Sequence, residues 1–471
     1  MRRTPTACEL RMIGAGVLLG ACATEPAGIS RQMPPEIASA IVAADEHNTL
    51  SAIVAVRVSR ADSVAVRFNL RDESAAAASV TPAVLVTGDS ANVPVLGLLP
   101  DRQYVARLVA YGVSGTAIGE PLDFVTGSLP SDLPRFAAGG PDPSPGYVVF
   151  AAGRYGLVID NAGRVVWYRR FPNGAGLNFM AQPTGRYVVR PPTPEVGDIE
   201  PWLELDPLGN VTRTLTCAGG LQPRPHDLIL QPDGSYWVLC DETRTMDLTA
   251  VGGVAGARVT GTVVQHVAGS GALLFQWSPF EHFEITDLEA AERTGADVNW
   301  THGNALDLDA DGNVIVSFRS LNELTKIDVR TGSVMWRMGG RRNQFTFLDT
   351  SAPAFSRQHG ARAYAPHGIL LLDNVGDPTE SWAERYVLDE ATRTARLTRS
   401  YGSTPAAITQ IGGSTQDLPD GHTLVSFGTA GRVEEYDAAG NVMWRIEGNA
   451  GYVFRAQRIR SLYQPGLGTA R

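Results

Sequence analysis

The stretch GLVIDNAGRVVWYRR, residues 156–170, contains an apolar strand, a turn from Asp to Gly, and a second strand with a tryptophan. The same order returns in LTKIDVRTGSVMWRMGG, residues 324–340, and in RVEEYDAAGNVMWRIEG, residues 432–448. Asp and Gly at this spacing favour a tight turn between two antiparallel strands. The tryptophan then lies on the outgoing strand, where it can pack between neighbouring sheets. Repetition of this unit predicts an array of similar β-sheets.

A second phrase alternates with the first, as LILQPDGSYWVLC at 228–240, LDLDADGNVIVSF at 306–318 and STQDLPDGHTLVSF at 414–427. Two hairpins together make one four-stranded sheet. Counting the starts of these sheets gives six, near Tyr147, Phe179, His226, His302, His359 and Thr415. The sequence therefore predicts an all-β fold with a six-bladed β-propeller over residues 140–471. The DADGN turn lacks the glutamate that a calcium loop needs at its end, so we interpret it as turn chemistry.

Alternating strands such as residues 52–58 and 63–68 precede the repeats and predict a β-sandwich over residues 30–130. The stretch 95–127 is similar to the end of a fibronectin type III domain, with Tyr104 as the candidate for a tyrosine corner. A segment rich in Gly, Pro and Ser, residues 127–146, links the two domains. We expect no chemistry in the sandwich.

Two arginines near the start precede the apolar run of residues 12–21, which is too short to span a bilayer. Residues 1–22 are therefore predicted to be a secretion signal. The run ends in LGAC, which resembles the lipobox of bacterial lipoproteins and implies a lipid anchor on Cys22. Ala23 implies the outer membrane, so we expect an exported protein, anchored by lipid on the periplasmic side of the envelope. The alternative is an ordinary signal peptide with a chance cysteine.

Besides Cys22, only Cys217 and Cys240 remain after the predicted signal. In an oxidising compartment these two can form a disulfide, and the alternative is two separate buried thiols.

The formal net charge of −9 indicates which partners to expect. Binding to nucleic acid needs a basic face, so nucleic acid is not an expected partner. An anion must instead be bound by a local cluster of Arg and His that acts against the overall field.

Three histidines begin or closely precede predicted innermost strands, which face the channel of a propeller. They are His226 in RPHDLILQPDG, His302 in NWTHGNALDLDADG and His359 in SRQHGARAYAPHG. Arg319 follows on the strand after His302, so a hairpin brings the two together. A planar guanidinium and histidines near their ordinary pKa suit an anion with charge spread over several oxygens. Three histidines also suit zinc, although a neighbouring arginine disfavours a dication.

The phrases PHD, THGN, SFRS, QHGAR with LLDN, and STQDLPDGHTLVSFG resemble, in this order, those of the bacterial arylsulfotransferase (ASST) family. The resemblance implies transfer of a sulfuryl group from a phenolic sulfate ester to a phenol through a sulfohistidine, with no nucleotide donor and no cofactor. It implies His359 as the nucleophile, His226, His302 and Arg319 as further catalytic residues, and Asn304 as a substrate-binding residue. Gly360 occupies the position of the family's usual Asp.

The expected partners are small phenolic sulfates, phenols and, through the anchor, the membrane; whether the chain forms a homodimer is left open. His226 or His302 is expected to protonate the departing phenolate. His266, His282, His367 and His422 fall in turns or loops and are expected to be structural, and Asp373 is expected to cap a turn. The alternative function is a non-catalytic propeller lipoprotein that binds a ligand or an envelope protein.

Overall fold

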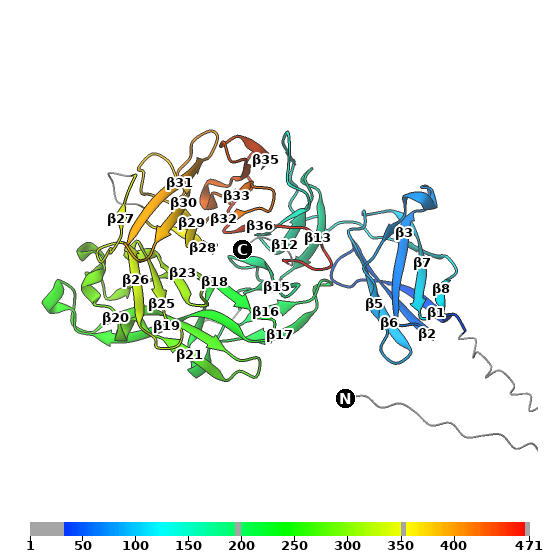
Figure 1. The fold of residues 1–471 in the computed structure, drawn as a ribbon, viewed down its shortest axis with the longest axis horizontal. Coiled ribbons are helices and arrows are strands. Elements are labelled where there is room, and N and C mark those ends of the chain that lie inside the picture. The colour runs from blue at the N-terminus through cyan, green and yellow to red at the C-terminus, as the bar shows by residue number, and fades with distance from the viewer. Residues whose placement is uncertain (1–32, 194–198, 350–354, 467–471) are drawn as a thin grey trace, which may run out of the picture.

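The computed structural model describes residues 33–193, 199–349 and 355–466. The predicted signal segment and Cys22 lie outside the described residues. Figure 1 shows two bodies side by side, a small sandwich and a larger ring of sheets. Within the described ranges, all helices are short 3-10 turns: η1 (Ala75–Ala77), η2 (Ala218–Gly220), η3 (Thr249–Val251), η4 (Pro279–Glu281), η5 (Ile285–Asp287), η6 (Ala290–Arg293), η7 (Arg319–Leu321) and η8 (Gly428–Ala430).

The sandwich consists of a three-stranded sheet in the order β1-β2-β6 and a six-stranded sheet around β3 and β7. The strands are β1 (Glu36–Ala44), β2 (Ser51–Ser59), β3 (Ser63–Leu70), β4 (Ser79–Val80), β5 (Val84–Leu85), β6 (Ser90–Leu96), β7 (Gln103–Gly112), β8 (Gly115–Ile118) and β9 (Leu122–Val125). The hydroxyl of Tyr104 accepts a hydrogen bond from the backbone N–H of Leu99 over 2.9 Å. This is the bond of a tyrosine corner, the feature on which the prediction of a fibronectin-like sandwich rests.

The ring consists of six antiparallel sheets, which are the blades of the predicted propeller. The first three are β11 (Tyr147–Ala152), β12 (Tyr155–Ile159) and β13 (Val165–Arg170) with β36 (Ala456–Ile459); β14 (Phe179–Gln182), β15 (Arg186–Val189), β16 (Trp202–Leu205) and β17 (Val211–Leu215); and β18 (Gln222–Leu230), β19 (Tyr236–Met246), β20 (Ala257–Val267) and β21 (Leu273–Trp277), with β22 (Asp297–Asn299) beside β20.

The last three blades follow in chain order. They are β23 (Gly303–Leu308), β24 (Val314–Phe318), β25 (Glu323–Ile327) and β26 (Val334–Gly339); β28 (His359–Tyr364), β29 (Gly368–Asp373), β30 (Trp382–Asp389) and β31 (Thr394–Gly402), with β27 (Thr346–Phe347) at the edge; and β32 (Ser414–Asp417), β33 (Thr423–Ser426), β34 (Val433–Tyr436) and β35 (Val442–Ile446), with β10 (Ala138–Gly139) at the edge.

The ring is closed twice. Strand β36, near the C-terminus, pairs with β11 and is the innermost strand of the first blade (Figure 1). Strand β10 pairs with β35 at the outer edge of the last blade. Segments from both ends of the propeller sequence therefore hold the first and last blades together.

The repeated tryptophans pack as predicted, between one blade and the next. Trp167 on β13 lies against Tyr187 of the second blade, with ring centroids 4.9 Å apart. Trp444 on β35 is fully buried in one cluster with Phe150 of the first blade. The aspartate of the same repeat makes the turn, since Asp160 accepts hydrogen bonds from the N–H groups of Ala162 and Arg164. The repeat thus supplies both the hairpin and the contact between blades.

Polar side chains join neighbouring innermost strands around the channel. Asn178 donates to the carbonyl oxygen of His226, and Asp227 accepts from the N–H of Leu306. Asn304 donates in turn to the carbonyl oxygen of Gln358. These bonds fix the relative height of adjacent blades.

The sandwich contacts the ring through two tyrosines of the propeller. The hydroxyl of Tyr168 accepts from the N–H of Thr49 over 3.0 Å, and that of Tyr463 accepts from the N–H of Leu96 over 3.1 Å. Leu50 of the sandwich is buried in the core cluster of the first blade.

Across the described residues, no helix is long and apolar enough to cross a membrane.

Candidate functional site

The three predicted histidines converge at one end of the channel. His226 lies on β18, His302 directly precedes β23, and His359 is the first residue of β28. The rings of His226 and His302 have centroids 5.1 Å apart. The ring of Phe454, just before β36, lies 5.6 Å from that of His226 and 5.9 Å from that of His359. Four blades therefore contribute to one cluster, which is almost wholly buried at His226 and His359.

Each histidine lies at an irregularity in strand pairing. The register shifts between Pro223 and Leu228 in β18, between Gly303 and Ala305 in β23, and between His359 and Arg362 in β28. A bulge of this kind redirects the side chains beside it. Three bulges at the same end of the channel are what aim these side chains at one point.

Gly360 forms the bulge beside His359, with a left-handed φ of 62°. A Cβ atom at this position would lie 2.7 Å from Cα of Ser414 and 2.9 Å from the carbonyl oxygen of Gly413. The backbone of the next blade thus passes too close for any side chain. In this chain, a glycine after the histidine is what the local backbone requires.

Asn374 fixes the orientation and tautomer of His359. Its amide nitrogen donates to the carbonyl oxygens of Thr409 and Gly412, at 3.1 and 2.9 Å. Its Oδ1 must therefore face His359, whose Nδ1 lies 2.8 Å away and donates the proton. The lone pair of the neutral ring is consequently on Nε2, the nitrogen that can attack an electrophile.

His302 has the opposite tautomer. Asn299 donates from Nδ2 to Nδ1 of His302 over 2.6 Å, which leaves the proton of the neutral ring on Nε2. Within the described chain, Nδ1 of His226 and Oδ1 of Asn304 are buried without a hydrogen-bond partner. Buried polar atoms are normally paired, so these two indicate a site built for a polar ligand.

All three histidines are held neutral. Burial lowers the pKa of His302 to about 2, and the charges of Arg224 and Arg319 add to this effect. Burial also lowers the pKa of His359 to about 4, with Arg319 lowering it further and the bonds to Asn374 and the Arg357 backbone opposing. The pKa of His226 is lowered by burial, then by Arg224. His226 and His302 are thus hydrogen-bonding groups at rest rather than the ready acids expected from an ordinary pKa.

Arg319 lies beside His302, as the hairpin predicts. Its backbone N–H donates to the carbonyl oxygen of His302 over 3.0 Å, and its guanidinium donates to the carbonyl oxygen of Gln410. Two further arginines act on the cluster and were not singled out from the sequence. Arg190 ends the second strand of its blade, and Arg224 lies two residues before His226. The spacing of two residues in RPHD was the available signal, because in a regular strand it would put Arg224 and His226 on one face.

Asp373 caps a turn, as expected. Its Oδ1 accepts from the N–H groups of Ser356 and Gly376, both at 2.9 Å. Burial raises its pKa to about 6, against the lowering effect of these bonds. Because Asp373 joins the segment before His359 to the strand end before Asn374, it holds the two partners of that hydrogen bond in place.

The other predicted positions lie outside the cluster. His266 stacks on Trp237, His282 stacks on Trp277, and His422 contacts Glu435. Trp300 is buried in the hydrophobic core.

Cys217 and Cys240 are joined by a disulfide bond. Cys240 on β19 pairs with Pro223 on β18, close to Arg224 and His226. The bond therefore ties the loop before β18 to the neighbouring strand.

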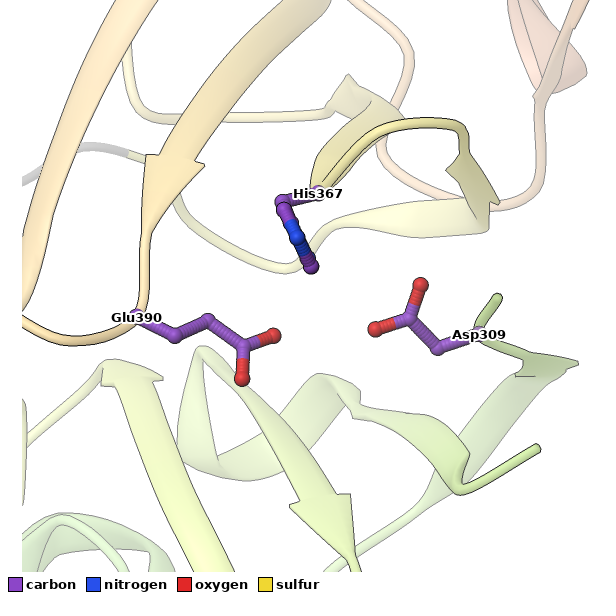
Figure 2. Close-up of side chains that lie close together, drawn as sticks. All are labelled: Asp309, His367 and Glu390. Carbon is purple, nitrogen blue, oxygen red and sulfur yellow. The ribbon is translucent and has the colours of Figure 1, made fainter. Parts of the chain in front are cut away.

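One group in the described residues has the spacing of metal ligands, Asp309, His367 and Glu390, with ligand atoms within 4.8 Å of one another (Figure 2). It is separate from the three channel histidines. Nζ of Lys326 lies 2.5 Å from Asp309, 2.8 Å from Asp311 and 2.8 Å from Glu390. The lysine ammonium supplies the cation for these carboxylates and joins the turns of two blades. The DADGN turn is part of this arrangement.

Comparison with solved structures finds likenesses of low identity. A protein of unknown function from Bacteroides caccae has a TM-score of 0.43 and 13% identity, covering 68% of this chain and 100% of that one. A streptogramin B lyase has a TM-score of 0.38 and 11% identity, covering 66% and 84%. A regucalcin described as a calcium-binding protein, from Agrobacterium tumefaciens, has a TM-score of 0.33 and 15% identity, covering 69% and 95%. Identities this low indicate no function.

No curated protein matches the chain. Residues 224–449, however, match the family described as Arylsulfotransferase (ASST). The matched segment contains all five residues proposed for the site from the sequence. Over residues 224–449, the chain is thus similar to the arylsulfotransferase (ASST) family.

Proposed function

We propose that this protein transfers a sulfuryl group from a phenolic sulfate ester to a phenol, through a sulfohistidine and without a nucleotide donor. The observation that carries the proposal is the bond between His359 and Asn374, which leaves the lone pair of a neutral imidazole on Nε2. Nε2 attacks sulfur, a nitrogen–sulfur bond forms, and the bond from sulfur to the aryl oxygen breaks. An acceptor phenol then attacks the same sulfur, its proton passes to the neutral imidazole of His226 or to water, and the nitrogen–sulfur bond breaks, which restores the neutral imidazole of His359.

The charge of the sulfuryl oxygens is met by fixed donors. Arg319 offers a planar set of N–H groups, and His302 offers its Nε2–H. The side chain of Asn304 donates to the carbonyl oxygen of Gln358, the residue before His359, and its buried Oδ1 has no partner. We assign to this side chain the role of positioning the substrate. Such preorganised donors stabilise a transition state because they need no reorientation as charge develops.

The leaving group is a phenolate, whose conjugate acid has a pKa of about 10, so it departs more easily than an aliphatic alkoxide. Phe454 provides an aromatic wall that touches two of the histidines, and Tyr452 lies next to it with ring centroids 6.4 Å apart. Binding of the sulfate anion raises the pKa of the nearby imidazoles, because an opposite charge favours their protonated form. His226 and His302 then share a proton with the departing oxygen.

The test is a pre-steady-state experiment with an aryl sulfate and no acceptor. The protein should release a burst of about one equivalent of phenol and gain one sulfuryl group at His359, mapped at alkaline pH because an N-sulfonated imidazole is labile to acid. His359→Asn should abolish both. The matched control is His367→Asn, in the turn between β28 and β29, which should keep the burst. A burst that persists in His359→Asn contradicts the assigned nucleophile.

We also propose that the protein is exported and anchored by lipid at Cys22 on the periplasmic side of the outer membrane. The disulfide between Cys217 and Cys240 supports export, because such bonds persist in oxidising compartments. Cys22→Ser should move the protein from the membrane fraction to the soluble fraction or block its processing. Unchanged fractionation contradicts the anchor.

A further inference from the structure

The arginines around the three histidines differ in how their charge is balanced. In the described chain, Arg319 has no carboxylate within ion-pair distance and donates only to the carbonyl oxygen of Gln410. Arg190 instead pairs with Glu200 at 2.7 Å, and Arg224 pairs closely with Asp241. Both paired arginines are more than nine-tenths buried. Their carboxylates are only partly exposed, so these pairs are part of the site wall.

The two pairs form one electrostatic unit that faces the histidines. The pKa of Arg190 is lowered mainly by burial, raised by Glu200 and Asp241, and lowered by Arg224. After burial, Arg224 is the largest cause that lowers the pKa of both His226 and His302. The two arginines therefore act on the imidazoles, and each of them is ion-paired with a carboxylate.

In the layer below the histidines, positive and negative charges balance. Asp227 binds Arg362 at 2.8 Å and Arg455 at 3.2 Å, and Asp307 interacts with the charge of Arg362. Two arginines thus face two aspartates. The histidines are neutral. Among the described arginines that act on the histidines, Arg319 is thus the one whose positive charge has no carboxylate partner.

We infer that Glu200 and Asp241 determine substrate specificity by holding the charge of this site at plus one, which fits a sulfate monoester and rejects a dianionic ester such as a phosphate monoester. The inference rests on the proposed function and names the feature by which that site selects its substrate. A sulfate monoester carries one negative charge, whereas a phosphate monoester carries −1.5 to −2 near pH 7. The two have nearly the same tetrahedral shape, so hydrogen-bond geometry separates them poorly and charge must do so.

The physical reason is the cost of a buried charge without a partner. A monoanion beside Arg319 balances its charge, while a dianion leaves one negative charge without a partner beside the largely buried imidazoles of His226 and His359. Removal of a carboxylate from the wall adds one positive charge and relieves that cost. The carboxylates of Glu200 and Asp241 therefore favour a monoanion over a dianion, and they lower the affinity of the site for both anions.

The test uses two probes that cannot be transferred, benzenesulfonate and phenylphosphonate, with binding measured by calorimetry. Benzenesulfonate stays a monoanion, and phenylphosphonate loses its second proton near neutral pH. At pH 8 the protein should bind benzenesulfonate at least about tenfold more tightly than phenylphosphonate. At pH 5 the affinities for the two probes should become similar. Because benzenesulfonate keeps its charge at both pH values, any change in its own affinity reports titration of groups in the protein. The groups to consider are His226, His302, His359, Arg190, Arg224, Arg319, Glu200, Asp241, Asp373 and Tyr452.

Asp241→Asn keeps the size of the side chain and a hydrogen-bond acceptor for Arg224 while it removes the charge. It should reduce the preference for benzenesulfonate at pH 8 by about tenfold, mainly through tighter binding of phenylphosphonate. Glu200→Gln should act in the same direction and provides a second route if one variant does not fold. The control is Asp89→Asn, which breaks an exposed pair with Arg57 on the sandwich and should change neither affinity.

Equal affinities for the two probes at pH 8, or a preference unchanged in both Asp241→Asn and Glu200→Gln, would overturn the inference. Failure of both probes to bind would overturn the anion site itself. A charge preference that shifts as expected in a protein with no sulfuryl transfer would support this inference and count against the proposed function.

Discussion

If His359 is the nucleophile, as proposed, its pKa predicts an unusual pH dependence of the reaction. Only the neutral ring has a lone pair on Nε2, and its pKa is lowered to about 4 by burial and by Arg319. The value of kcat/KM should therefore stay level down to about pH 5 and fall as the pH drops through about 4, rather than through the ordinary value near 6.5. A pH profile with an aryl sulfate checks this.

The variant Arg319→Ala tests the same argument in a second way, through both the value and the pH profile of kcat/KM. Loss of a charged donor to the transferring group should lower kcat/KM about a hundredfold. Because the positive charge of Arg319 lowers the pKa of His359, its removal should also move the acidic limb to higher pH. A profile centred near pH 6.5 in the unaltered protein would contradict the burial argument.

Asn374 acts on the reaction only through His359, so it is a positioning residue. Asn374→Ala removes the acceptor of the Nδ1 proton and lets the ring rotate or change tautomer. We expect kcat to fall about tenfold to a hundredfold with KM nearly unchanged, because the substrate contacts remain. Asn441→Ala, in an exposed turn, should leave both constants unchanged. A change in KM alone would show that Asn374 contacts the substrate.

At the scale of the strand, the bulge at Gly360 is what aims His359. Gly360→Ala places a Cβ against the backbone of Ser414 and Gly413 and also strains a left-handed conformation. Gly153→Ala is the matched control, because its φ of 57° is close to the 62° of Gly360 and nothing lies within 4 Å of the added Cβ. We expect loss of activity and a lower unfolding midpoint for Gly360→Ala, and a small loss of stability alone for Gly153→Ala. If the two variants lose the same activity and stability, the strained backbone conformation accounts for the loss, and the close approach of the next blade does not.

The elements that the sequence predicts well are those with a local cause. The turn aspartates, the alternating strands and the tryptophans gave hairpins and blades, because each depends on neighbours within about fifteen residues. The bulges at the histidines could not be predicted in this way. They arise where one blade approaches the next, and nothing within β28 alone shows that Ser414 lies against Gly360.

The candidate site also combines features with a local cause in the sequence and features that depend on contacts between blades. Its histidines and Arg319 were found because they occur in recognisable phrases, and Arg190 was missed because it acts from another blade. The lowered pKa values of the histidines follow from burial, which the sequence does not display. The predicted proton donors lie together at one end of the channel, but their pKa values are lowered and not near the ordinary value that the sequence suggested.

At the scale of the whole molecule, Asp227 connects the ring across its channel. It belongs to the third blade and accepts from the N–H of Leu306 in the fourth, from Arg362 in the fifth, and from Arg455 beside the strand that closes the first. Arg455 also donates to the carbonyl oxygen of His226. One fully buried carboxylate therefore links four blades directly beneath the histidines.

Asp227→Asn should destabilise the propeller strongly. The amide matches the carboxylate in size, so no cavity forms, but the buried Arg455 and the partly buried Arg362 lose the negative charge that they share. Breaking a buried pair by removing one partner costs about 3–5 kcal/mol, which should appear as a clear drop in the thermal midpoint. Asp297→Asn, which removes the exposed partner of Arg258, should leave the midpoint almost unchanged. If both variants melt like the unaltered protein, the blades are held by their apolar contacts and the two ring closures alone. If only Asp227→Asn melts early, the charged layer under the candidate site also holds the ring together, in addition to the apolar contacts and the two ring closures.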